Sequence, residues 1–235
     1  MINKALLKKD LKLLGRDPMT ILLALLPFLL EGLVQLILRL NPFQYLPFQP
    51  DLKQLEQLLR GMLPFFGGMM GGWMAGFLIL EEREDDMIPL LRMSPLKNGE
   101  LLTTRLFLAA GLGLAANLLL YAADRLLFGP DRGILLIFCL SALTGPFCLL
   151  VMVRFGKNRV QGLTLAKLSS LILLPPVVML LTGKTPFGVF GILSPLSWLM
   201  DGFRSALGGD FSLPGPLAGT LYLGVLSLPL MRKRE

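Results

Sequence analysis

The sequence contains no histidine and only two cysteines. Histidine is the commonest metal ligand and the commonest general base near neutral pH, so its absence argues against a metal site and against ordinary acid–base catalysis. Cys139 and Cys148 lie in one apolar run, and steps of about 100° per residue place them on opposite faces of a helix. We therefore expect two buried thiols that do not pair, and a chain that is not an enzyme.

Charged residues are also scarce, at 17% of the chain, whereas a soluble domain has about a quarter. Apolar runs long enough to cross a bilayer as helices recur along the whole length instead. We predict one all-α membrane domain over residues 1–235 with six transmembrane helices. The predicted spans are 18–40, 62–80, 101–123, 134–153, 163–181 and 213–231.

Three segments outside these spans have helical patterns of their own. Residues 1–17 form an amphipathic pattern, with Asp10 as the one acid away from the basic face, which predicts a helix in the membrane interface. Residues 41–61 are expected to form an external loop with a short interfacial helix. Residues 194–207 are too short to cross a bilayer, which favours a re-entrant or interfacial helix with Trp198 at headgroup level. The basic face of the first segment consists of Lys4, Lys8, Lys9, Lys12 and Arg16.

The positive charges set the expected orientation in the membrane. Most Lys and Arg residues lie on the two termini, between spans two and three, and between spans four and five. Cytoplasmic segments carry such an excess. Six spans then place both termini and residues 81–96 in the cytoplasm.

The stretch 81–96, EEREDDMIPLLRMSPL, is the most unusual part of the chain. It begins with five acidic residues within 81–86, a density that lipid would not accept. Residues 87–93 have the pattern of a short apolar helix, and Ser94-Pro95 is typical of the start of the third span. A solvated helix end would explain the acidic residues alone. An apolar helix beside a charge cluster is typical of a docking element, so we predict that another protein binds here.

Two polar residues inside the spans are candidates for the transport pathway. Glu31 either lines a cavity, or pairs with a cation, or lies nearer the interface than its position suggests. Asn117 either lines a pathway or bonds across helices, and the second role is the commoner one. Asp124, at the end of the third span, is expected to be solvated.

The second span has a face of glycines that would let another helix approach closely. The partner helix would belong either to the same chain or to a second copy, and the sequence favours neither. These glycines are Gly68, Gly72 and Gly76.

A nucleotide-binding site is not expected in this chain. Gly183-Lys184-Thr185 looks like the end of a phosphate-binding loop, but Val178 occupies the place of the first glycine that such a loop needs. We expect no cofactor on this chain and no nucleic-acid partner. If ATP drives the protein, the ATPase must be another chain.

The sequence resembles the membrane subunit of type-2 ABC transporters, which are permeases that work with a separate ATPase. After the second span that family carries Glu-Arg-Glu, a short apolar helix and Thr/Ser-Pro-Leu. The matching residues are Glu82, Arg83, Glu84, Ile88, Leu91, Ser94, Pro95 and Leu96. A second family mark, a Ser-Pro-Leu helix with Trp, Asp and Arg, is matched by Ser194, Pro195, Leu196, Trp198, Asp201 and Arg204. Residues 157–162 resemble the fluoroquinolone or multidrug export branch, whereas Asp86-Met87 departs from the usual Gly-Thr.

The resemblance implies a half-transporter in a prokaryotic plasma membrane. ATP and Mg²⁺ would bind to a partner ATPase subunit, and a second permease subunit, identical or different, would complete the path through the lipid bilayer. Residues 82–95 would couple the two proteins, and the substrate would be a lipophilic or amphiphilic compound, either drug-like or a lipid. The alternatives are a secondary transporter or channel without an ATPase, and a membrane assembly protein that transports nothing.

Overall fold

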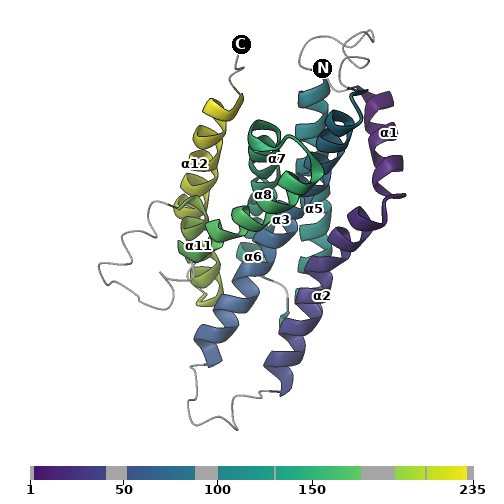
Figure 1. The fold of residues 1–235 in the computed structure, drawn as a ribbon. Helices are drawn as coiled ribbons and strands as arrows, with labels where there is room; N and C mark the ends of the chain where they lie inside the picture. Colours follow the sequence, from purple (N-terminus) through teal and green to yellow (C-terminus); the bar gives the residue numbers. More distant parts are fainter. Residues whose placement is uncertain are drawn as a thin grey trace.

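A computed structural model describes residues 3–40, 52–87, 100–129, 131–175, 194–209 and 211–231. Every regular element in these ranges is a helix. Figure 1 shows an elongated bundle in which α1 (Lys4–Leu14), the end of α3 (Leu52–Glu84), the start of α5 (Glu100–Phe128) and the end of α12 (Pro214–Met231) share one end. We call this the terminal end of the molecule, and the opposite end the far end.

The first two helices are separate, as predicted. The side chain of Asn3 caps α1 by accepting hydrogen bonds from two backbone N–H groups, which satisfies donors that a helix start leaves unpaired. Helix α2 (Pro18–Leu40) has the bounds expected for the first span. Most of its side chains face outward, because its buried positions repeat at helical spacing along a single stripe. These buried positions are Thr20, Pro27, Glu31 and Val34.

Helix α3 lies at the centre of the bundle. Of its most apolar stretch, 94% is buried, against 17% for α2. The prediction of a separate interfacial helix within residues 41–61 was wrong for the described part, because α3 begins at Leu52 and runs without a break into the second span. Tertiary contacts support this extension: a side chain at Gly61 would meet Met200 of α11 (Pro195–Leu207).

The predicted fourth span is two helices in line, α6 (Arg132–Ser141) and α7 (Thr144–Phe155). The hydroxyl of Thr144 donates to the carbonyl of Ser141 at 2.7 Å. Such side-chain bonds compete with the helical ladder, and here one lies across the break. The periodicity of an apolar run cannot indicate this interruption, because both halves are equally hydrophobic.

The last third of the chain departs most from a simple bundle. Helix α8 (Arg159–Ser169) continues into a short 3₁₀ helix, η2 (Ser170–Leu173). The remainder of the predicted span 163–181, beyond Pro175, lies outside the described residues. Helix α11 was expected, and most of its side chains are buried against the bundle rather than lying on its surface.

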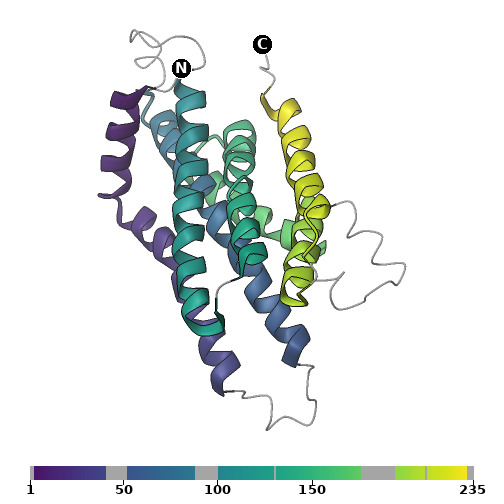
Figure 2. The ribbon, with the colours of Figure 1, turned by 180° about the vertical axis from the view of Figure 1, so that it is seen from behind.

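Five stretches of the described chain are long and apolar enough to cross a membrane. They are Pro18–Leu40, Leu55–Glu84, Glu100–Leu126, Arg132–Phe155 and Pro214–Met231. Large apolar side chains remain exposed on α2, α5 and α12. The view from behind in Figure 2 shows these three helices on the outside of the bundle. A multi-pass membrane protein exposes this kind of surface to lipid.

Candidate functional site

The acidic stretch begins with a buried ion cluster at the terminal end. Arg105 of α5 has no exposed side-chain surface, and its guanidinium donates to both carboxylate oxygens of Glu82 at 2.7 Å. The same guanidinium donates to Asp10 of α1 at 3.1 and 3.4 Å. Two parallel N–H···O bonds are the strongest form of this ion pair. One buried cation therefore joins three helices that are far apart in the sequence.

This cluster explains the acid that interrupts the amphipathic pattern of α1. Asp10 lies on the buried stripe of α1 with Leu6 and Leu14, facing the bundle. A second contact supports the same docking, because the backbone N–H of Asn3 donates to the hydroxyl of Thr104 at 3.1 Å. The amphipathic helix is thus bound to the bundle along one stripe, while its lysines remain exposed.

The other charges of the Glu-Arg-Glu motif contact the segment that joins α7 to α8 and the first residue of α8. Arg83 donates to the carbonyl of Gly156 at 2.5 Å, and Glu84 accepts from the backbone N–H of Arg159 at 3.3 Å. The guanidinium of Arg159 lies 2.5 Å from the carboxylate of Glu81. The motif therefore fixes the end of α3 to other parts of the terminal end, with Glu82 buried, Arg83 partly buried and Glu84 exposed.

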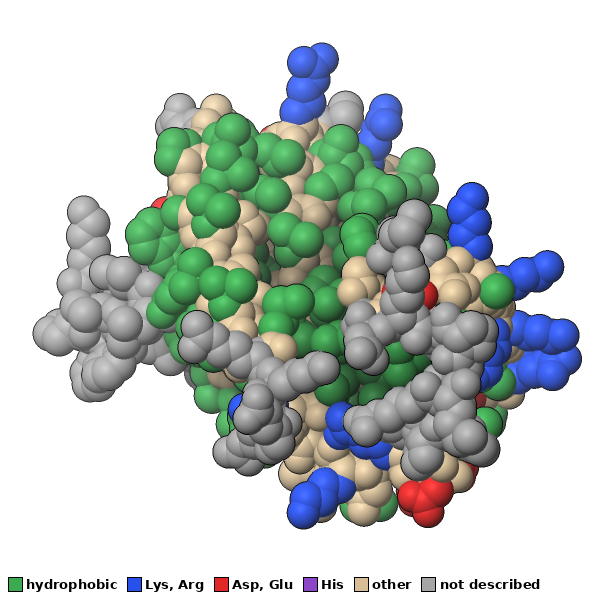
Figure 3. All heavy atoms as spheres, turned by 90° about the horizontal axis from the view of Figure 1, so that it is seen from above, with side chains coloured by type: hydrophobic (Ala, Val, Ile, Leu, Met, Phe, Trp, Pro, Cys, Tyr) green, Lys and Arg blue, Asp and Glu red, His purple; other side chains and the backbone are tan. Residues whose placement is uncertain are grey.

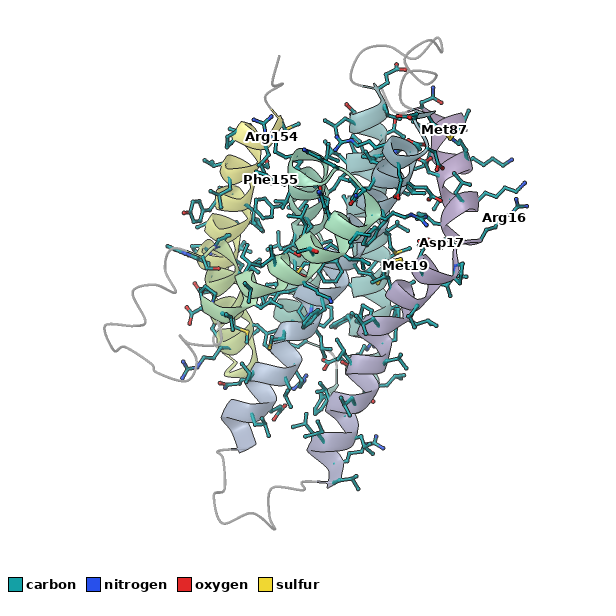
Figure 4. The ribbon with its side chains drawn as sticks, in the orientation of Figure 1. Arg16, Asp17, Met19, Met87, Arg154 and Phe155 are labelled. Carbon is teal, nitrogen blue, oxygen red and sulfur yellow. The ribbon has the colours of Figure 1, made fainter. Side chains whose placement is uncertain are left out.

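The exposed part of the motif follows directly. Asp85, Asp86 and Met87 are exposed, and Asp86 has a positive φ of 51°. Met87 is labelled in Figure 4, where it lies at the terminal end beside α1. The predicted docking residues Ile88 and Leu91 lie outside the described residues, as do Ser94 and Pro95. Their role in coupling stays a prediction.

The terminal end is rich in exposed positive charge. Figure 3 looks onto this end and shows Lys and Arg side chains projecting from its rim, while hydrophobic side chains cover a neighbouring flank. Figure 4 shows Arg16 and Asp17 at the joint between α1 and α2, on the outer side of the bundle. A basic rim above an apolar flank is typical of a surface at the boundary between lipid and cytoplasm.

A second buried ion cluster lies towards the far end. Arg60 of α3 donates to both oxygens of Asp124 of α5 at 2.8 and 2.9 Å, and it also donates to Glu56. The Arg60 guanidinium lies 3.7 Å from the centre of the Phe128 ring, a cation–π contact. The expectation that Asp124 is solvated was wrong, because its side chain is 3% exposed and fully paired.

Glu31 lies on the buried stripe of α2 and faces the bundle, not lipid. Its Oε1 accepts from the amide of Gln35, and its Oε2 has no hydrogen-bond partner among the described residues. A small cavity of about 220 Å³ begins one turn further along and is lined by Gln35, Leu38, Arg39 and Phe128. The geometry is compatible with a place on the pathway, which remains a prediction.

Asn117 bonds across helices, the commoner of the two roles weighed for it. Its amide nitrogen donates to the carbonyls of Pro64 and Phe138 and to the hydroxyl of Ser141, at 2.8 to 3.0 Å. The last four carbonyls of any helix lack helical partners, and the Phe138 carbonyl belongs to that group in α6. Asn117 therefore compensates for the break between α6 and α7.

The glycine face of α3 packs inside the chain. A Cβ at Gly68 would lie 2.2 Å from the carbonyl of Ser141, and one at Gly72 would lie 2.1 Å from the carbonyl of Gly145. A Cβ at Gly76 would lie 2.6 Å from the sulfur of Met152. The sequence left open whether the partner helix belongs to the same chain or to a second copy. In the structure this glycine face packs against α6 and α7 of the same chain.

The chemistry of the described residues is that of packing and ion pairing. No group of three His, Cys, Asp or Glu side chains within them could hold a metal ion. Cys139 and Cys148 are free thiols, and Cys148 is buried.

Comparison with known proteins gives one match. The model of a family described as "Fluoroquinolones export permease protein Rv2686c-like" matches residues 10–231, nearly the whole chain. No curated protein and no solved structure matches.

Proposed function

Because the chain belongs to the Rv2686c-like fluoroquinolones export permease family, we propose that it is the membrane-spanning subunit of an ATP-driven exporter. The ATPase is a separate chain, and two permease subunits together form the path. The substrate is an amphiphilic compound that enters from the lipid or the cytoplasm. The observation that carries the proposal is this family match over nearly the whole chain, joined to the helical membrane architecture.

The proposed topology has six crossings with both termini in the cytoplasm. Phe155 ends α7 towards the terminal end, and α12 begins at Pro214 and returns to the terminal end at Met231 (Figures 1 and 4). The chain must therefore pass from one end to the other between residues 156 and 213. In this proposal α8, η2 and the residues beyond Pro175 make that passage, and the basic rim faces the cytoplasm.

In this proposal the ATPase binds the loop after α3 and moves it. Glu82 is joined to Arg105 and Asp10, so a displacement of the end of α3 would be passed to α1 and α5 together. Glu82 would then act by positioning helices and not by touching the ATPase, because its side chain is only 7% exposed. The contact itself would be made by Met87 and the residues that follow it.

A secondary transporter is the second candidate, and one observation favours it. The buried groups Glu31, Arg60 and Asp124 give this chain more charge inside the bundle than its sequence indicates. Such groups can couple transport to ion movement. Transport that continues without ATP but collapses with the ion gradient would support this candidate over the first.

The test places a charge on the proposed contact. Met87→Asp adds a carboxylate to a side chain that is 39% exposed beside the predicted docking helix. We expect co-purification of the co-expressed ATPase, and ATP-dependent export from inverted vesicles, to fall at least tenfold. The matched control is Leu126→Asp, an exposed apolar residue near the far end, which should leave co-purification unchanged. Normal co-purification and export in the Met87→Asp protein would refute the proposed coupling.

A further inference from the structure

The far-end cluster contains more acid than base. Arg60 is bonded to Asp124 and to Glu56, so one guanidinium already serves two carboxylates. Glu31 of α2 lies within electrostatic reach of both Arg60 and Asp124. Three carboxylates thus share one cation, and two of them, Glu31 and Asp124, are buried, whereas Glu56 is partly exposed. Such an excess is balanced either by a proton on one of the carboxylates or by a further positive charge.

Glu31 is the member of this cluster that is left incomplete. Its residue is 4% exposed, and Oε2 has no hydrogen-bond partner among the described residues. Gln35 occupies the other oxygen only, and an amide is neutral. Asp124 accepts two bonds from Arg60, and the side chain of Glu56 is partly exposed to solvent, so among the described members of this cluster only Glu31 has a buried oxygen available to a further donor.

The missing partner has the chemistry of an organic ammonium group. No set of three metal-ligating side chains forms in the part of the chain that the structure describes, which disfavours a metal ion here. An ammonium group needs only one carboxylate and adds N–H donors that fit the vacant oxygen. About nine residues separate Glu31 from the end of α2 at Leu40, a rise of roughly 14 Å, so the bound charge would lie inside the apolar layer.

The surroundings can take the apolar body of such a molecule. The cavity of about 220 Å³ is lined by Gln35, Leu38, Arg39 and Phe128. Gln35 connects it to Glu31, because its side-chain amide donates a hydrogen bond to the Glu31 carboxylate. This volume is below the range for a whole drug-sized ligand, so it would hold a portion of one. Arg39 is exposed, so water screens its charge, whereas the charge of Glu31 is buried.

We propose that Glu31 binds the protonated amine of the exported amphiphile, in a site between α2, α3 and α5 that opens when Gln35 turns away. This inference rests on the proposed export function and adds the substrate class, amphiphilic amines. A neutral amphiphile of the same shape would lack the group that the site recognises. Amine binding would also explain why Glu31, an acid, lies on the buried stripe of an otherwise apolar helix.

Binding to the purified permease, without any ATPase, tests this directly. The probes are a dansyl-labelled alkylamine and its neutral acetamide, measured by fluorescence with the protein in lipid nanodiscs. We expect the wild-type protein to bind the amine at least tenfold more tightly than the acetamide. Glu31→Gln keeps the shape and the contact with Gln35, and it should abolish that preference without weakening acetamide binding. Asp201→Asn makes the same chemical change on an exposed residue of α11 and should retain the preference.

Several outcomes would overturn the site. Equal binding of both probes by the wild-type protein would mean that Glu31 carries only a proton. A Glu31→Gln protein that keeps the preference would place the amine elsewhere, and one that loses both probes alike would show a structural role. If Glu31→Gln does not fold, Glu31→Asp retains the charge and must retain the preference for the amine. This binding experiment uses no ATP, so its result does not depend on whether the protein is an ATP-driven exporter. The proposed export function is tested separately by the Met87→Asp experiment.

Discussion

At the scale of single residues, Asp86 is a strained point in the described chain. Among the described non-glycine residues it has a positive φ, at 51°. The type-2 ABC transporter membrane subunits that the sequence resembles usually have glycine at this position. The left-handed conformation costs residues with a Cβ about 1–2 kcal/mol, somewhat less for Asp, and costs glycine nothing. We expect Asp86→Gly to raise the free energy of unfolding by about 0.5–1 kcal/mol. Thermal unfolding in detergent measures the change.

The neighbouring acid supplies the control for Asp86. Asp85 is also exposed and lies in the same turn, but its φ is not positive. Asp85→Gly should therefore give no gain and a small loss from backbone entropy. If both variants were stabilised equally, loss of acidic repulsion would explain the effect, and the argument from φ would fail.

The glycines of α3 allow a second prediction at this scale. Gly72→Ala brings a methyl group to 2.1 Å from the carbonyl of Gly145, a backbone atom that cannot turn away. Forcing the helices apart should cost about 1–3 kcal/mol or more. Gly111 of α5 has nothing within 4 Å of its added Cβ, so Gly111→Ala should be neutral or slightly stabilising. Unfolding of both variants in parallel checks this, and equal losses would contradict the packing argument.

At the scale of helices, Arg105 determines how α1 is held. Arg105→Met leaves the carboxylates of Asp10 and Glu82 buried together without their shared guanidinium. Removing one partner of a buried ion pair costs about 3–5 kcal/mol. We expect a loss of this size in unfolding and faster proteolysis of the segment that contains α1.

The same helix offers the matched variant. Arg125 of α5 is exposed, so Arg125→Met removes the same charge from solvent and should change stability by less than about 0.5 kcal/mol. Limited proteolysis distinguishes the two residues, since only the loss of Arg105 should release α1. An α1 segment that stays protected in Arg105→Met would mean that its remaining contacts suffice to hold it: the packing of Leu6 and Leu14, the Asn3–Thr104 hydrogen bond and the ion pair between Lys9 and Glu82 at 3.4 Å.

The positions of most long apolar helices could be predicted from the sequence, whereas the early start of α3, the break between α6 and α7 and the cross-links between helices could not. The length of an apolar run fixes where a span can lie, and α2 has the expected bounds for this reason. The partner of a buried charge depends on packing between segments as far apart as Asp10 and Arg105. One signal was present in the sequence. Asp10 lies on the apolar side of an amphipathic helix and Arg105 lies inside a predicted span, so each is a charge in an apolar position, and their charges are opposite. The free oxygen of Glu31 has no partner among the described residues. A partner from outside the chain leaves no pattern in the sequence, so it could not have been predicted from the sequence.

At the scale of the whole molecule, α3 and α5 form the part least able to deform. Arg105 joins them at the terminal end and Arg60 joins them near the far end, each by a two-bond ion pair. Between these points another glycine of α3, Gly71, packs directly against α5, because a Cβ there would lie 2.3 Å from the carbonyl of Ala109 and 2.5 Å from the backbone nitrogen of Gly113. In the proposed exporter, alternating access would therefore come from elements around this pair, and α2, which is little buried, is the element that carries Glu31.

The proposed six crossings place both ends of the chain on one side of the membrane. Lys12, Arg132 and Met231 are exposed and described, and each can be replaced by cysteine in a background where Cys139 is serine. With six crossings, a membrane-impermeant maleimide added to intact cells should label Arg132→Cys. It should reach Lys12→Cys and Met231→Cys only after the membrane is opened. Labelling of Met231→Cys in intact cells would mean that residues 156–213 do not cross, and the chain would then have five spans and termini on opposite sides.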